Sequence, residues 1–378
     1  MLARHFFKTH ISPELKTFFL SAGLADIAFG MGMVFEPVFL YSVVGFSLQK
    51  VLLYFACVYG LYALLAPLGA KFVSRLGLSG GYFLGCVLQV LYWIAFVMIP
   101  TNSYFAVIAC IIFGIQKSVF WPSYHALMFE YRDKRSAGRE FSYLYSVVIV
   151  GYILSPYFAG VLSQQINPSV PFYIAMVVYL FSGVLLLVKL RPTLKHKVTV
   201  VGSMSYVFKM PGKFIGYAGF GEEVLHFTAW SVFVFLTVGS FEGFGLFAAL
   251  AGFFSAIAVL VTGKLSDVKG NGELKVLSVM NAIFYIVRAI MPASVGGLFV
   301  ADALGRTTKD QIFVAVSSDV YHKPGRENLE YSAFFEQSLA IGKALACLLG
   351  VVLFTMTGGS FASLFILAAI FSLLYLFI

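Results

Sequence analysis

Ionisable side chains recur inside long apolar stretches of the sequence, where a charge is unfavourable. An isolated charge in the middle of a bilayer costs about 2.5–3.5 kcal/mol on insertion scales, so such a residue is a candidate functional group. An unpartnered carboxyl group there can bind a proton in one conformation and release it in another, and a lysine can hold an anionic group. These positions are Asp26, Glu36, Lys117, His125, Glu222, Glu223, His226, Arg288, Asp302, Arg306, Lys309, Asp310, Glu336 and Lys343.

The composition predicts that the elements carrying these residues span a membrane. Of 378 residues, 60% are hydrophobic and only 11% are charged, whereas soluble domains average about 25% charged residues. A span needs about 20 apolar residues, and the runs show no period-two alternation, so we expect an all-α polytopic membrane protein without strands. The twelve predicted helices are 15–44, 51–69, 80–99, 104–131, 141–163, 171–190, 213–240, 243–265, 273–292, 295–321, 330–356 and 359–378.

The distribution of basic residues predicts the orientation. Most lysines and arginines fall on one side of the twelve spans, including Lys71, Arg75 and the stretch 132–139, whereas Lys50 alone falls in a connection on the other side. Cytoplasmic connections are the basic ones, so we expect both termini in the cytoplasm and a multi-pass protein of the cell (inner) membrane. The net charge of +9 is thereby explained without a nucleic-acid partner. The four cysteines lie in apolar runs without metal-ligand spacing, so no metal or cofactor is expected.

The chain repeats itself at a spacing of about 190 residues. The run Ala22–Asp26 resembles Ala218–Glu222, and Gly151 corresponds to Gly342. Gly138-Arg139-Glu140 also matches Gly325-Arg326-Glu327. We therefore predict two pseudo-symmetric six-helix halves, 1–190 and 213–378, joined by a basic cytoplasmic linker, 191–212. Parallel six-helix repeats are a recurrent design of membrane transporters.

The connections after predicted helices 2 and 8 contain a motif that is typical of one family of transporters. The connection after helix 8 reads Gly263-Lys264-Leu265-Ser266-Asp267-Val268-Lys269-Gly270. It resembles the signature of the major facilitator superfamily, in which a glycine, an aspartate, a basic residue and a second glycine follow at fixed intervals, although Val268 stands here in place of the basic residue. The first copy, Ser74-Arg75-Leu76-Gly77, has serine where aspartate is usual. The resemblance extends over essentially the whole chain. It implies a cytoplasmic gate that includes Arg75, Gly77, Gly263, Asp267, Gly270, Arg139 and Arg326.

The fifth predicted helix carries a second pattern, Gly151 through Pro156 to Gly160. It is similar to the glycine-proline pattern of the family's proton-driven exporters, with Ser155 and Ala159 in place of two glycines. The alternative is that small residues simply let neighbouring helices pack closely.

The resemblance also implies that helices 1, 4, 7 and 10 line a central cavity. At 1.5 Å per residue, Asp26 and Glu222 lie about 15 Å from the cytoplasmic side, and Lys117 and Lys309 lie about 20 Å from it. Each half thus presents a carboxylate with a slightly deeper amine. We predict Asp26 and Glu222 as the proton-coupling pair, with Glu336 next. His125 is either a proton relay or a hydrogen-bonded structural residue.

The remaining polar candidates are assigned to the solute. Asp302, Arg306 and Lys309 follow i, i+4, i+7 spacing, which places them on one helix face. The predicted solute-binding residues are Lys117, Tyr124, Trp230, Asp302, Arg306 and Lys309. The alternative is that acids and bases only neutralise one another, although acids outnumber bases among the intramembrane positions.

These expectations describe a monomeric secondary active transporter, of prokaryotic type by its short connections, that moves a small organic solute with protons or another cation. The open alternative is a lipid or lysolipid flippase on the same scaffold. An enzyme is disfavoured because the sequence lacks the hydrolase and metalloprotease motifs. Inward-pointing charges of both signs disfavour a channel.

Overall fold

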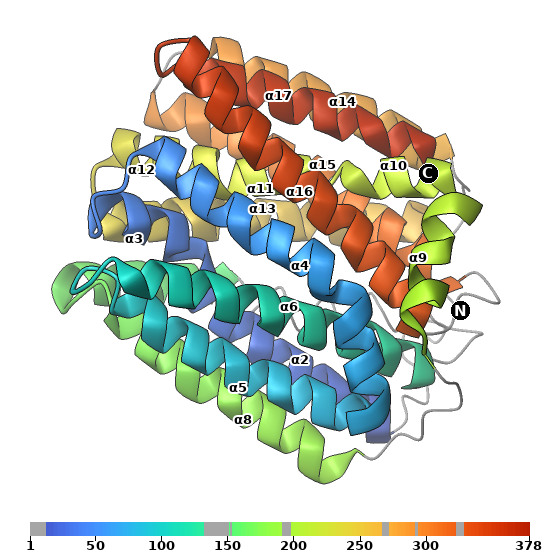
Figure 1. Ribbon diagram of the computed structural model, residues 1–378. Helices are drawn as coiled ribbons and strands as arrows, with labels where there is room; N and C mark the ends of the chain where they lie inside the picture. Colours follow the sequence, from blue (N-terminus) through green and yellow to red (C-terminus); the bar gives the residue numbers. More distant parts are fainter. Residues whose placement is uncertain are drawn as a thin grey trace, which may run out of the picture.

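The computed structural model describes residues 13–131, 151, 153–190, 198–266, 272–291, 294–322 and 329–378. Within these ranges every regular element is a helix, as expected for a backbone that must satisfy its own hydrogen bonds in lipid (Figure 1). Six helical segments of this part of the chain are long and apolar enough to cross a membrane. They are Pro13–Ser42, Leu48–Leu76, Leu78–Val97, Tyr104–Tyr131, Val170–Lys189 and Leu329–Met356.

The first predicted span is interrupted. It consists of α2 (Pro13–Met31), the 3₁₀ turn η1 (Met33–Phe35) and α3 (Glu36–Ser42). Pro37 lies in the first turn of α3, where a missing N–H is tolerated. Glu36 is completely buried beside this break and accepts a hydrogen bond from Trp93 Nε1 at 2.9 Å.

The next elements follow the prediction closely. They are α4 (Leu48–Leu76), α5 (Leu78–Val97), α6 (Tyr104–Tyr131), a helical stretch at 153–165 and α8 (Val170–Lys189). Gly77 joins α4 directly to α5 with a φ of 88°, a backbone conformation that glycine adopts at no steric cost. Gly77, one of the residues assigned to the gate, therefore forms a tight turn between the two helices.

Two elements differ from the prediction. The linker contains a helix, α9 (Val200–Lys209), where only a polar connection was expected. The seventh span is broken into α10 (Pro211–Ala218), α11 (Gly221–Leu225), the π-turn η2 (His226–Trp230) and α12 (Ser231–Val238). Gly219 and Gly221 flank the first of these breaks.

The chain then continues through long helices to its end. They are α13 (Phe241–Ser266), α14 (Gly272–Ile290), α15 (Val295–His322), α16 (Leu329–Met356) and α17 (Phe361–Leu373), followed by η3 (Leu374–Phe377). Ile378 packs against the second half of α10, since a Cβ at Gly216 would meet the Ile378 side chain. The end of the bundle where α8 stops and α10 begins is the predicted cytoplasmic end. We call the opposite end the outer end.

The helices form two groups that meet along α4 and α16, which run side by side through the centre (Figure 1). In one group α2 packs on α8 through reciprocal bonds: Ser21 Oγ donates to Ser182 O and Ser182 Oγ to Ser21 O, both at 2.8 Å. In the other, α14 packs on α17 through Asn281 Nδ2, which donates to Ser372 Oγ at 2.9 Å. Both contacts lie within a predicted half.

At the outer end the two groups touch. The Phe35 and Phe244 rings pack edge to face with centroids 5.3 Å apart. Gly160, from the 153–165 helix, lies against Gly245 of α13 so closely that a Cβ at Gly245 would come within 2.9 Å of the Gly160 Cα atom. The glycines of the fifth-helix pattern thus contribute to close helix packing, as the second interpretation of that pattern expects.

Candidate functional site: a central polar cavity

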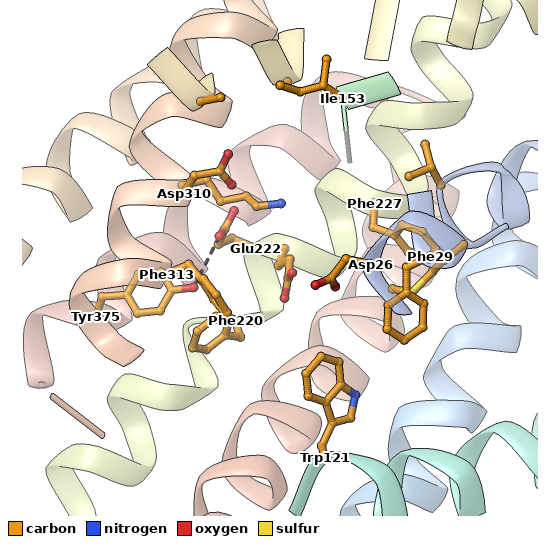
Figure 2. A pocket seen from close by; sticks show the side chains of 16 residues that line it. Asp26, Phe29, Trp121, Ile153, Phe220, Glu222, Phe227, Asp310, Phe313 and Tyr375 are labelled. Atoms are coloured by element: carbon orange, nitrogen blue, oxygen red, sulfur yellow. Dashed lines mark hydrogen bonds between the residues drawn. The ribbon is translucent and has the colours of Figure 1, made fainter. Parts of the chain in front are cut away.

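Two adjoining pockets lie at the centre of the bundle, with volumes of about 240 Å³ and 170 Å³. Their walls come from α2, α6, the broken seventh span, α15, α4 and α16 (Figure 2). The expected helices therefore line the cavity, and α4 and α16 add to it. The residues shared by both pockets are Asp26, Phe29, Met33, Trp121, Phe220, Glu223 and Phe313.

Asp26 stands at the junction of the two pockets, on α2. Its side chain is only partly buried and is drawn among Phe29, Trp121 and Phe220 (Figure 2). No residue of the described part of the chain forms a hydrogen bond or ion pair with its carboxylate. An acidic group in an aromatic-walled cavity therefore faces only the cavity.

Glu222 lines the larger pocket from the seventh span but is held differently. It is buried and accepts hydrogen bonds from the Tyr285 hydroxyl and, at 3.4 Å, from the Tyr375 hydroxyl. The two carboxylates predicted as a matched pair thus share a cavity but not an environment. Tyr285 and Tyr375 come from distant parts of the chain, and no local motif marks them.

Glu336 of α16 bridges the two groups of helices. It accepts a hydrogen bond from the Tyr62 hydroxyl of α4 and lies 2.5 Å from His125 Nε2 of α6. His125 and Glu336 both line the smaller pocket. The structure therefore brings together two predicted coupling residues and adds Tyr62, whose role the sequence did not reveal.

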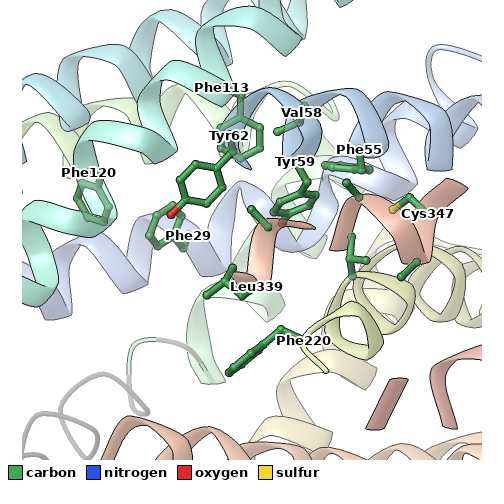
Figure 3. Close-up of a cluster of buried hydrophobic side chains, with 14 of the residues drawn as sticks. Phe29, Phe55, Val58, Tyr59, Tyr62, Phe113, Phe120, Phe220, Leu339 and Cys347 are labelled. Atoms are coloured by element: carbon green, nitrogen blue, oxygen red, sulfur yellow. The ribbon is translucent and has the colours of Figure 1, made fainter. Parts of the chain in front are cut away.

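The lysines of the cavity have unequal surroundings. Lys117 is 4% exposed, lies 4.1 Å above the Phe113 ring and 5.5 Å from the Tyr59 ring centroid, and forms no ion pair within the described ranges. Both rings belong to the buried aromatic cluster of Figure 3. Lys343 binds Glu223 at 2.6 Å. Lys343 and Glu223 thus form a pair of the kind that the alternative interpretation describes, in which acids and bases neutralise one another.

Lys309 and Asp310 line the larger pocket from α15. Ser255 Oγ of α13 donates to Asp310 at 2.5 Å, which fixes this carboxylate at the wall. Tyr124 lines the smaller pocket, and its ring packs 5.3 Å from that of Phe18. Lys117, Lys309 and Tyr124 thus have access to a solute in the cavity.

Asp302, Arg306 and Trp230 line neither pocket, contrary to the expectation that they contact the solute. Asp302 is completely buried and accepts from Arg288 Nη2 at 3.0 Å and from Arg306 Nη2 at 3.3 Å. Arg288 also covers the Trp230 ring at 4.3 Å. The helical spacing was correct, but α14 supplies an arginine to that face, so these side chains form an internal network.

Only some of the residues predicted to form the cytoplasmic gate lie within the described part of the chain. Arg75 is exposed in the last turn of α4, next to the Gly77 turn. Gly263 lies within α13, and Asp267, Gly270, Arg139 and Arg326 lie outside the described residues. In the fifth-helix pattern, a Cβ at Gly151 would meet Ile27 of α2, and Pro156 adjoins the Ser155 that contacts Gly30. Among the described residues, no three His, Cys, Asp or Glu side chains come together in a group that could hold a metal ion.

Comparisons with known proteins agree with this architecture. The family model of the Major Facilitator Superfamily matches residues 18–305. A crystal structure of the human organic anion transporter MFSD10 aligns with a TM-score of 0.73 at 14% identity, covering 97% of this chain and 99% of that chain. A crystal structure of the E. coli fucose:proton symporter FucP aligns with a TM-score of 0.67 at 13% identity, covering 96% and 97%. A second FucP structure, described as outward, gives 0.67 at 14%. A search of curated protein sequences finds no match. The fold is therefore the all-α, twelve-helix fold of these transporters.

Proposed function

Because the chain belongs to the Major Facilitator Superfamily and is a secondary transporter, we propose that it moves a small organic solute by alternating access, coupled to protons through Asp26. The observation that carries this proposal is the Asp26 carboxylate at the junction of the two pockets, which has no hydrogen-bond or ion-pair partner among the described residues. Two rocking halves, 1–190 and 213–378, open the cavity alternately to each side.

The coupling follows from the environment of Asp26. Aromatic side chains surround this residue, so an ionised carboxylate is poorly compensated once the cavity closes and water leaves. Proton binding removes the charge and with it most of the cost of closure. Protonated protein therefore passes between the two open states more readily, and a proton gradient biases the direction.

Glu336 and Glu222 support this step from the cavity wall. Glu336 contacts Tyr62 and His125 across the boundary between the halves, so these contacts must break or rearrange when the halves rock. His125 can then accept the proton of Glu336 or return it. Glu222 stays with Tyr285 and Tyr375 inside its own half and is assigned a secondary part in coupling.

The walls indicate the general chemistry of the solute. Phe29, Trp121, Phe220 and Phe313 offer ring faces to an apolar body, and Lys117 and Lys309 offer donors to polar groups. The pocket volumes suit a metabolite-sized molecule. Thermal-shift screening of the purified protein with water-soluble metabolites and with lysolipids is the first experiment, because stabilisation by lysolipids alone would favour the flippase alternative.

The coupling is tested in proteoliposomes with the solute that the screen identifies. We expect an imposed pH gradient to drive uptake by the unsubstituted protein and to have no effect on Asp26→Asn, which can still bind and exchange the solute. Glu222→Gln should retain part of the gradient response. Glu14→Gln, an exposed position on the same helix, is the matched control. Wild-type gradient dependence in Asp26→Asn would refute the assignment.

A further inference from the structure

The linker helix α9 exposes apolar side chains on the face that it turns away from the protein. Its inner face packs on α16: the Tyr206 ring lies 5.5 Å from Tyr331 and 5.7 Å from Phe334. On the outer face Val201 is 79% exposed and Phe208 is 86% exposed. With Met204, 47% exposed, they follow i, i+3, i+7 spacing and form one stripe. A helix that is apolar on both faces requires an apolar environment on both.

The helix is fixed at the cytoplasmic end of the bundle. Thr199 caps it by accepting from Gly202 N at 2.9 Å, and Thr199 N in turn donates to Glu330 Oε1 of α16 at 2.7 Å. In Figure 1 α9 runs across the ends of the spanning helices and not parallel to them. It lies between the end of α8 at Lys189 and the start of α10 at Pro211, which are both predicted membrane boundaries. This position corresponds to the level of the lipid headgroups.

The positive charge of the linker segment is consistent with a position among the lipid headgroups. Between Lys189 and Lys213 the sequence contains basic residues but no aspartate or glutamate. Lys209 is exposed beside the apolar stripe. Clusters of lysine and arginine at the cytoplasmic membrane surface attract anionic lipids. The basic residues of the segment are Lys189, Arg191, Lys195, Lys197, Lys209 and Lys213.

We propose that α9 is an interfacial helix that lies in the plane of the inner leaflet and binds anionic lipid. Val201, Met204 and Phe208 enter the boundary between headgroups and acyl chains, and the exposed Lys189 and Lys209 contact the headgroups. Amphipathic helices of this composition bind through buried apolar area together with attraction to anionic lipid. A protein partner or a second copy would cover the same stripe, but neither accounts for the headgroup depth and the basic flanks together.

The depth is tested with Phe208→Trp in nanodiscs of phosphatidylcholine and 30 mol% phosphatidylglycerol. The emission of the unsubstituted protein, from Trp93, Trp121 and Trp230, is subtracted. We expect blue-shifted added emission that lipid brominated at carbons 6 and 7 quenches more strongly than lipid brominated at carbons 11 and 12. Tyr104→Trp, 76% exposed at the outer end, is the matched comparison for an exposed aromatic at the opposite boundary. Red-shifted emission that neither lipid quenches, or a blue shift that depends on protein concentration, overturns the proposal.

The headgroup preference is tested with the same variant and bromine on one lipid at a time. At equal mole fraction, brominated phosphatidylglycerol should quench the added emission about twice as strongly as brominated phosphatidylcholine. Adding Lys189→Gln and Lys209→Gln, which remove the two exposed basic side chains described at the ends of α8 and α9, should return this ratio to one. A ratio of one before these changes refutes the anionic-lipid part. Neither result depends on proton coupling, so the test is independent of the proposed function.

Discussion

Asp26 and Glu222 occupy corresponding places in the sequence repeat, yet only Glu222 has hydrogen-bond donors, Tyr285 and Tyr375, within the described structure. The sequence predicted that both residues sit in apolar helices, where a charge is a candidate functional group, and the family resemblance implied that these helices face one cavity. The sequence could not predict which of the two carboxylates accepts hydrogen bonds from the protein, since the two tyrosines that donate them come from α14 and η3. The same holds for Lys343, whose partner Glu223 lies more than one hundred residues away along the chain.

The hydrogen bond between Tyr62 and Glu336 should make a small but measurable contribution to the free energy of unfolding. Hydrogen bonds between membrane helices average about 0.6 kcal/mol and reach about 1.7 kcal/mol, so Tyr62→Phe should lower the free energy of unfolding by an amount in this range. Reversible unfolding of the protein in mixed micelles measures the loss. In a double-mutant cycle with Glu336→Met, which removes the acceptor oxygen, the two losses should not add, because each substitution removes the same hydrogen bond. Strict additivity would show that the two side chains do not interact.

Substitution of Asp302 should lower stability far more, because this buried carboxylate accepts hydrogen bonds from the buried Arg288 and the partly buried Arg306. Removing one partner of a buried ion pair leaves an uncompensated charge and costs about 3–5 kcal/mol. Asp302→Asn should therefore lower the thermal midpoint in detergent strongly. Adding Arg306→Met to this variant should recover part of the loss by removing one excess charge. A midpoint unchanged by Asp302→Asn would contradict the network.

At the scale of elements, the uninterrupted spans were the easiest to predict and the broken ones the hardest. α4, α5, α6 and α16 are long apolar runs, and their predicted bounds differ from the observed ones mainly at the ends. The seventh span was predicted as one helix, whereas glycines and a π-turn divide it. Its run of apolar residues conceals these breaks, since a π-turn changes hydrogen bonding without changing composition. The linker helix α9 escaped prediction because its charged surroundings suggested a connection.

The close approach of the 153–165 helix to α13 predicts a difference between two glycines. A Cβ at Gly245 would lie 2.9 Å from the Gly160 Cα atom, whereas a Cβ at Gly60 would meet nothing within 4 Å. Gly245→Ala should force the helices apart and cost about 1–3 kcal/mol. Gly60→Ala should be neutral or stabilise by up to about 1 kcal/mol, because alanine favours helix. Thermal unfolding of both variants in the same detergent makes the comparison, and equal effects would contradict the contact.

At the scale of the whole molecule, the sequence repeat and the hydrophobic pattern were sufficient to predict a twelve-helix transporter, which the family match and the structural neighbours confirm. The repeat does not say which end of the cavity is closed, because one sequence supports both states. In this structure the two groups of helices meet at the outer end, where the Phe35 ring packs against the Phe244 ring.

The packing of Phe35 on Phe244 predicts that the reactivity of position 244 depends on the transport cycle. Phe244 is buried between the two groups of helices. Phe244→Cys should resist a membrane-impermeant maleimide added outside and should react several times faster when a solute or pH gradient drives the transport cycle. Tyr104→Cys, exposed at the same end, should react at one rate under both conditions. Equally fast labelling of both positions would mean that the outer end is not closed at rest.

The hydrogen bonds between Thr199 and Glu330 also limit how far the two halves of the protein can move apart. They tie the start of α9 to α16, so the chain that crosses from one half to the other runs only from Leu190 to Val198. Eight residue steps reach at most about 28 Å when fully extended. The connection is therefore a short tether anchored at both ends, and any excursion that would pull Leu190 farther from α16 requires the anchor at Thr199 to release first.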